Sequence, residues 1–225
     1  LVSYLAHSLD ADIASAAAAG VEGAFYNNGQ SCCAVERIYV HESIYDAYVE
    51  AYVVEAKKMV SGNPTEEGTF LGSLTRPQQI AVLDQQVADA IEKGASLLLG
   101  GKRAERKGFY FEPTVLSNTN HSMDVMMEES FGPIIGIQKV KNDEEAIELM
   151  LDTPYGLTSA VYTKNEVRAL SIMSDLNSGT VYWNCCDRVS PNMPWSGRGN
   201  SGLGSTLSHA GIRTFVQPKS YHLRG

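Results

Sequence analysis

Segments rich in strand-forming residues alternate with longer segments of helical periodicity along most of this chain. We expect strands over residues 37–41, 96–100, 109–117, 133–140, 158–163 and 179–184. We expect helices over residues 10–25, 42–60, 76–94, 142–153 and 165–177, with Asp10 or Asp12 capping the first and Asn165 the last. Because parallel strands need a crossover connection, the alternation predicts an α/β fold, an open and mostly parallel twisted sheet with helices on both faces.

The chain is expected to form one main domain followed by a short tail. No Pro- or Ser-rich linker divides the 225 residues, and we assign residues 1–214 to the domain. Residues 215–225 read FVQPKSYHLRG, and Pro218 restricts them to an edge strand or an exchanged arm. Because an unpaired edge favours association, we expect this extended C-terminal segment to be an oligomerisation strand in a homo-oligomer.

The charge and cysteine content argue against several classes of partner and cofactor. A formal net charge of -8 argues against nucleic acid and anionic membranes as partners. No apolar run approaches the roughly 20 residues of a membrane-spanning helix, so no membrane insertion is expected. The four cysteines form two vicinal pairs, which suit neither a disulfide framework nor a metal site. We therefore expect no metal, and reduced thiols in a cytoplasmic or other reducing compartment.

The stretch FYNNGQSCCAVERIYV places Cys32 and Cys33 after a polar turn and just before a predicted strand. Catalytic residues favour loops that a rigid scaffold positions, and the Asn-Asn-Gly turn brings amide dipoles near the thiol. A tight turn with two buried thiols explains the same residues equally well. From this stretch alone, both interpretations stay open.

Three separated motifs resemble those of the NAD(P)-dependent aldehyde dehydrogenase superfamily. FYNNGQSC matches Phe-x-Asn-x-Gly-Gln-x-Cys, which ends on the family's nucleophile, and MEESFGPIIGI resembles Glu-x-Phe-Gly-Pro. GTVYWNCCDRVSPNMPWSGRGNSGLG resembles the late segment that runs from an Asn-containing strand into a Pro-aromatic-Gly-Gly loop. The motifs occur in the family's order over nearly the whole chain, so the resemblance implies the fold of the catalytic domain.

The resemblance also implies roles for individual residues. Cys32 is implied to attack an aldehyde and to carry first a thiohemiacetal and then a thioester. Glu129 and Phe131 are implied to contact the nicotinamide riboside of NAD or NADP. The residues implied to shape the nucleophile turn are Asn27, Gly29 and Gln30.

The late segment is implied to form one side of the substrate pocket. The implied pocket residues are Ser31, Cys33, Asp187, Arg188, Val189 and Trp195. Trp195 suits an aromatic wall or plain packing under the loop, and Arg188 suits anion recognition or a solvated rim. Asn184 is expected to hold the loop by side-chain hydrogen bonds. His41 and His121 lie beside polar, turn-like residues and are expected at the surface.

Part of the family's machinery is not found in this sequence. Family members resemble chains about twice as long, in which a nucleotide-binding domain and a general-base Glu-Leu-Gly-Gly stretch precede the catalytic domain. Glu22 is close in sequence to Cys32 and predicted helical, so it is a poor substitute base. We therefore interpret the chain as the catalytic domain alone, which by itself binds no cofactor and oxidises no aldehyde at a useful rate. A non-catalytic structural homologue and an NAD-independent thiol esterase stay open as alternatives.

Overall fold

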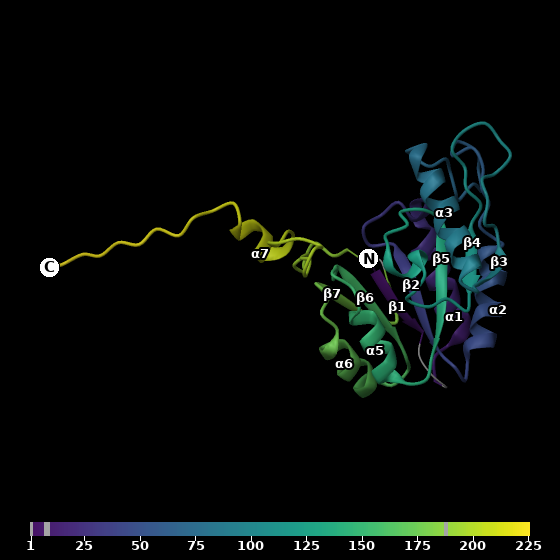
Figure 1. Cartoon of the computed structure of the whole chain (residues 1–225). Helices are drawn as coiled ribbons and strands as arrows, with labels where there is room; N and C mark the ends of the chain where they lie inside the picture. The colour runs from purple at the N-terminus through teal and green to yellow at the C-terminus, as the bar shows by residue number, and fades with distance from the viewer. Residues whose placement is uncertain (1, 7–9, 187–188) are drawn as a thin grey trace.

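The computed structural model describes residues 2–6 as backbone, and residues 10–186 and 189–225 in full. Within these residues one seven-stranded sheet has the order β3-β4-β5-β2-β1-β6-β7 (Figure 1). The strands are β1 (Val2–Ala6), β2 (Val35–His41), β3 (Ser96–Leu99), β4 (Thr114–Ser117), β5 (Ile134–Val140), β6 (Thr158–Tyr162) and β7 (Thr180–Trp183). Neighbouring strands are parallel except β3 and β4, which pair antiparallel at one edge.

Helices connect most of the strands. They are α1 (Ile13–Phe25), α2 (Tyr45–Ala56), α3 (Gln78–Glu92), α4 (Asp124–Met127), α5 (Asp143–Leu151), α6 (Glu166–Asp175) and α7 (Ser208–Arg213), with a 3₁₀ turn, η1, over Tyr26–Gly29. The Asp12 carboxylate accepts a hydrogen bond from the Ser15 N–H and caps α1, and the Asn165 side chain caps α6 by accepting one from the Arg168 N–H. None of the helices in the described parts of the chain is long and apolar enough to cross a bilayer.

The sheet carries a hydrophobic core on each face. On one face, α1 and α2 pack through Phe25 and Tyr52 onto the β2 residues Ile38 and Val40. On the other face, α3, α4, α5 and α6 pack onto the sheet in a second cluster that includes Tyr39. Because side chains alternate along a strand, successive β2 residues serve opposite cores. The predicted α/β fold with a mostly parallel sheet covered on both faces is confirmed.

Some elements differ from the sequence prediction. The strand expected over residues 109–117 is confined to Thr114–Ser117, because Pro113 cannot donate to a ladder. The strand β1, which lies in the middle of the sheet between β2 and β6, was not predicted, and neither were the short helices α4 and α7.

The C-terminal residues leave the body of the domain. In Figure 1, α7 and the segment after it extend away from the sheet. Residues 214–225 form no strand in this chain, and apolar side chains on α7 and on these residues are exposed. The exposed residues are Ile212, Phe215, Val216, Tyr221 and Leu223. The predicted pairing of the tail with another chain therefore stays a prediction.

Candidate active site

The turn that precedes Cys32 has an unusual backbone. Asn27, Asn28 and Gly29 are three consecutive residues with positive φ, at 50°, 57° and 69°. Asn and Gly tolerate this left-handed region better than other residues, which explains their choice here. The turn ends α1, and Cys32 follows in a second tight turn in which the Ala34 N–H donates to the Ser31 carbonyl at 3.1 Å. The Cys32 side chain is exposed, whereas Cys33 is buried.

Gln30 fastens this turn to a distant part of the chain. Its side-chain Nε2 donates to the Asn27 carbonyl at 3.2 Å, and the Asn27 Nδ2 donates to the Gln30 carbonyl at 3.0 Å. The Gln30 Oε1 accepts the Thr75 N–H at 2.9 Å, just before α3. The Asn27 and Gln30 side chains, both predicted in the nucleophile turn, therefore hydrogen-bond across the turn, and Gln30 also links the turn to the segment before α3.

A second turn, Glu129 to Pro133, lies next to the first. Strands β2 and β5 are parallel neighbours, and their register pairs Arg37 with Gly136. Cys32 precedes β2 by as many residues as Phe131 precedes β5, so the two turns meet at the same edge of the sheet. A Cβ built on Gly29 would lie 2.7 Å from the Gly132 carbonyl carbon, so the two backbones are in contact. Gly29 is required at this close approach.

Glu129 and Phe131 are exposed on this second turn, with Phe131 36% accessible. The backbone beneath them is buried and held by Glu36 of β2. The Glu36 carboxylate accepts the Ser130 N–H at 3.0 Å and the Phe131 N–H at 3.2 Å. Burial raises the pKa of Glu36 to about 7, while the two N–H donors favour the ionised form and oppose this rise.

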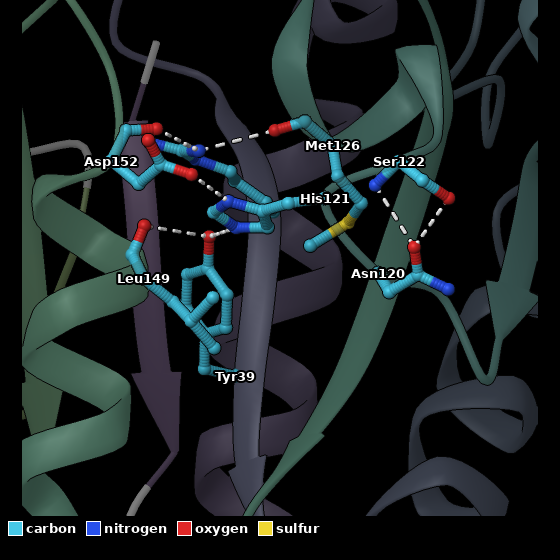
Figure 2. Close-up of polar contacts among 8 residues, drawn as sticks. Tyr39, Asn120, His121, Ser122, Met126, Leu149 and Asp152 are labelled. Atoms are coloured by element: carbon cyan, nitrogen blue, oxygen red, sulfur yellow. Dashed lines mark hydrogen bonds and ion pairs between the residues drawn. The ribbon is translucent and has the colours of Figure 1, made fainter.

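The chain leading to this turn is held by the opposite face of β2. Arg37 is fully buried and donates to the Met126 carbonyl at 3.1 Å. Figure 2 shows His121 between Tyr39 and Asp152: its Nε2 lies 2.7 Å from the Tyr39 hydroxyl and its Nδ1 2.7 Å from the Asp152 carboxylate. The expectation of a surface His121 was therefore wrong, because residues far apart in sequence enclose the ring. Burial lowers the pKa of His121, and the carboxylate partly offsets this.

A cavity of about 510 Å³ opens beside the nucleophile turn. Its described lining residues are Ala19, Glu22, Gly23, Tyr26, Ser31, Cys33, Asn184, Cys185, Cys186 and Val189. Ser31, Cys33 and Val189 were predicted to line a pocket, and the structure brings all three to this one. Glu22 is the one carboxylate among the described residues that line it, and it projects from the exposed side of α1.

Other predicted pocket residues lie elsewhere. Trp195 is not among the described lining residues; its backbone exchanges two 2.8 Å hydrogen bonds with Thr206, and it packs against the core that α1 and α2 cover. Asp187 and Arg188 lie outside the described residues. Ala19, Glu22 and Gly23 of α1 also line the cavity and were not predicted as pocket residues. Three further unpredicted lining residues follow or flank predicted ones and could have been found from those positions alone. They are Tyr26, Cys185 and Cys186.

Asn184 follows β7 and has a positive φ of 52°. Its Oδ1 accepts the Thr163 N–H and its Nδ2 donates to the Thr163 carbonyl, both at 3.0 Å. The side chain thus ties the end of β7 to the end of β6 and directs the following residues toward the cavity. In the parts of the chain that the structure describes, no three His, Cys, Asp or Glu side chains lie close enough to hold a metal ion.

The fold and the paired turns define an open α/β domain with an exposed thiol at the edge of its parallel sheet. The chain belongs to the aldehyde dehydrogenase family, whose family model matches residues 7–221. An aldehyde dehydrogenase-like protein of Schizosaccharomyces pombe is 39% identical to it, over 95% of this chain and 42% of that protein. The resemblance drawn from the three motifs is confirmed at the level of the family.

Two solved structures show the same fold. Betaine aldehyde dehydrogenase of Staphylococcus aureus in complex with NAD+ superposes with a TM-score of 0.90 at 32% identity, covering 95% of this chain and 43% of that one. An NADP-dependent enzyme of E. coli gives a TM-score of 0.93 at 30% identity, covering 96% and 45%. The chain thus spans less than half the length of these relatives.

Proposed function

We propose that this chain is the catalytic domain of an NAD(P)-dependent aldehyde dehydrogenase, which oxidises an aldehyde to a carboxylic acid and uses Cys32 as its nucleophile. The observation that carries the proposal is the contact between the Cys32 turn and the Phe131 turn at Gly29 and Gly132. It brings a thiol and the residues that resemble the family's riboside contacts to one sheet edge. The NAD+ complex and the NADP-dependent enzyme among the related structures support the cofactor class.

The residues present fit this cofactor. Glu129 and Phe131 offer a carboxylate and an aromatic ring to solvent, above a backbone that is buried and hydrogen-bonded at Ser130. Such a rigid platform with exposed side chains suits the ribose and ring of a nicotinamide. NAD or NADP, when bound, supplies the acceptor for the hydride that the aldehyde carbon loses. The choice between the two cofactors is made at the adenosine ribose, where NADP carries an additional phosphate.

Cys32 supplies the nucleophile in this proposal. The thiolate attacks the aldehyde carbon, and the backbone N–H of Cys32 is a candidate donor to the oxyanion that forms. The adjacent cavity of about 510 Å³ is large enough for a small aldehyde. Because a base and cofactor positioning each contribute several orders of magnitude to rate, we expect the chain to need a nucleotide-binding domain for turnover.

Limiting iodoacetamide followed by peptide mapping tests the nucleophile. Cys32 should be alkylated before Cys33 and Cys186, which are buried, and before Cys185. A p-nitrophenyl acetate burst that Cys32→Ala abolishes and Cys185→Ala retains would support acylation at this thiol. Equal labelling of all four cysteines contradicts the assignment, and a reactive thiol without NAD(P) reduction in the presence of a nucleotide-binding domain would favour the esterase alternative.

The tail supports a second part of the proposal, that residues 215–225 join the domain of residues 1–214 to another copy in a homo-oligomer. Phe215 and Leu223 are each 89% exposed, and solvent-exposed apolar side chains on an extended arm are usually covered by a partner. Deleting residues 215–225 should lower the mass measured by light scattering; an unchanged mass contradicts this role.

Because the four cysteines, all of them described, form no disulfide, we also propose a cytoplasmic or other reducing compartment.

A further inference from the structure

Glu36 is a buried carboxylate in the middle of an otherwise ordinary parallel sheet. It is the second residue of β2 and only 3% exposed. Its two oxygens accept different backbone donors, the Ser130 N–H at 3.0 Å and the Phe131 N–H at 3.2 Å. An apolar side chain would occupy a core strand at lower cost, because a buried carboxylate loses its hydration. The two hydrogen bonds are therefore what this position provides.

The turn that Glu36 holds has a strained backbone and is also hydrogen-bonded by a side chain of α3. Phe131 has a φ of 46°, in the left-handed region that an aromatic residue rarely adopts. Such a backbone persists only where its surroundings fix it. The Ser130 carbonyl accepts the Gln79 Nε2 at 2.5 Å, so Ser130 is bound at both its N–H and its carbonyl.

The nucleophile turn leads directly into the same strand. Cys32 is four residues before Glu36, and Arg37 and Tyr39 hold the chain that leads into the second turn, at Met126 and His121. Figure 2 shows the Tyr39 hydroxyl directed at His121, with Met126 on the neighbouring segment. Side chains of β2 thus help to set the position of the Glu129–Phe131 turn relative to Cys32, and Glu36 is the one that bonds this turn directly.

We propose that Glu36 is a positioning residue: by holding the Ser130 and Phe131 amides, it fixes the Glu129 and Phe131 side chains at a set place relative to Cys32. The inference rests on the proposed function for its catalytic consequence, because Glu129 and Phe131 are proposed there to contact the cofactor. The hydrogen bonds themselves are independent of that function and can be tested without it.

The first experiment measures amide hydrogen exchange in the 225-residue chain by NMR. In Glu36→Gln, the single amide oxygen replaces only one of the two carboxylate oxygens and can accept either the Ser130 N–H or the Phe131 N–H. The other N–H then faces an NH₂ group, which cannot accept it. At a pH above 7, where Glu36 is mostly ionised, exchange at Ser130 and Phe131 should become about 10- to 100-fold faster, the effect of losing a hydrogen bond to a charged group. Glu42→Gln is the matched control, because Glu42 is exposed just beyond the end of the same strand. Unchanged exchange in folded Glu36→Gln overturns the inference.

A second measurement serves if Glu36→Gln does not fold. In the unaltered chain, the Ser130 and Phe131 amide shifts should titrate together with one midpoint between about pH 5 and pH 9, since both amides bond to one carboxylate. Shifts that stay flat across the range, or that titrate with different midpoints, overturn the inference.

The third measurement separates positioning from plain structural support. In a form of the protein that reduces NAD(P) with an aldehyde, Glu36→Gln should raise the KM for the cofactor about tenfold and leave the alkylation rate of Cys32 within about twofold. An unchanged cofactor KM overturns the catalytic consequence. If the amides respond as expected but no form of the protein reduces NAD(P), Glu36 holds the turn and it is the proposed function that fails.

Discussion

Replacing Gly29 by Ala is the sharpest test of the contact between the two turns. Gly29 has a φ of 69°, which disfavours any side chain. A Cβ there would overlap the carbonyl oxygen of Gly132, and it would lie 2.7 Å from the Gly132 carbonyl carbon and 3.1 Å from the Ala24 carbonyl oxygen. All three neighbours are backbone atoms, which cannot move aside as a flexible side chain can.

Two costs combine at this position. The left-handed backbone costs an alanine about 1–2 kcal/mol, and forced overlap in a packed region costs about 1–3 kcal/mol more. Gly68→Ala isolates the first cost, because Gly68 has a φ of 84° and a methyl group placed on it would have nothing within 4 Å. The free energy of unfolding should therefore fall by about 1–3 kcal/mol more in Gly29→Ala than in Gly68→Ala.

Urea unfolding of both variants measures this difference, provided that the slope of unfolding free energy against urea stays constant. The rate of Cys32 alkylation provides a local readout, and it should change in Gly29→Ala but stay at its original value in Gly68→Ala. Equal losses of unfolding free energy in the two variants would refute the reasoning, because the Gly132 contact would then contribute nothing.

Three further predictions concern charge and hydrogen bonding. Folding raises the pKa of Glu36 from the usual 4.5 to about 7, so the folded state binds a proton at this site more tightly than the unfolded chain does. The resulting stabilisation is complete below about pH 4.5 and is lost as the pH rises through 7, by about 3 kcal/mol in total. Urea unfolding at several pH values should find this fall in the unaltered chain and not in Glu36→Gln. Tyr39→Phe should lower the free energy of unfolding by about 1–3 kcal/mol, since it leaves His121 Nε2 without its hydroxyl partner. Asp12→Ala should cost about 0.5–2 kcal/mol through loss of the α1 cap, whereas Asp84→Ala, at an exposed site inside α3, should cost nothing measurable in the same assay.

Local sequence signals were sufficient for most of the fold. The caps at Asp12 and Asn165 and the period of the apolar residues specify α1 and α6 without reference to the rest of the chain. The strand Val2–Ala6 could not be found in this way. It is identified as a strand by its pairing with β2 and β6, whose residues lie about 35 and 155 positions along the chain, and local propensity carries no record of such partners.

The residues of the candidate site likewise fall into those that local sequence signals identify and those that only long-range contacts reveal. Cys32, Glu129 and Phe131 were identified from short motifs, and these assignments stay predictions. Glu36 was missed because a charged residue at the start of a strand usually faces water, and its partners are two amides nearly a hundred residues later. His121 was misplaced for the same reason, since Tyr39 and Asp152 enclose it only after the chain has folded.

The two turns hold backbone conformations that neither would keep alone. Asn27, Asn28 and Gly29 are left-handed on one side of the contact, and Phe131 is left-handed on the other. Isolated peptides would leave these regions of φ, so the conformations depend on contacts made across the sheet edge. Because Gly29 packs on Gly132 and Glu36 holds the amide of Phe131, releasing either turn removes a support of the other. The geometry between the thiol and the Phe131 ring therefore depends on the shared contact, and Gly29→Ala, which breaks it, should raise amide exchange in both turns.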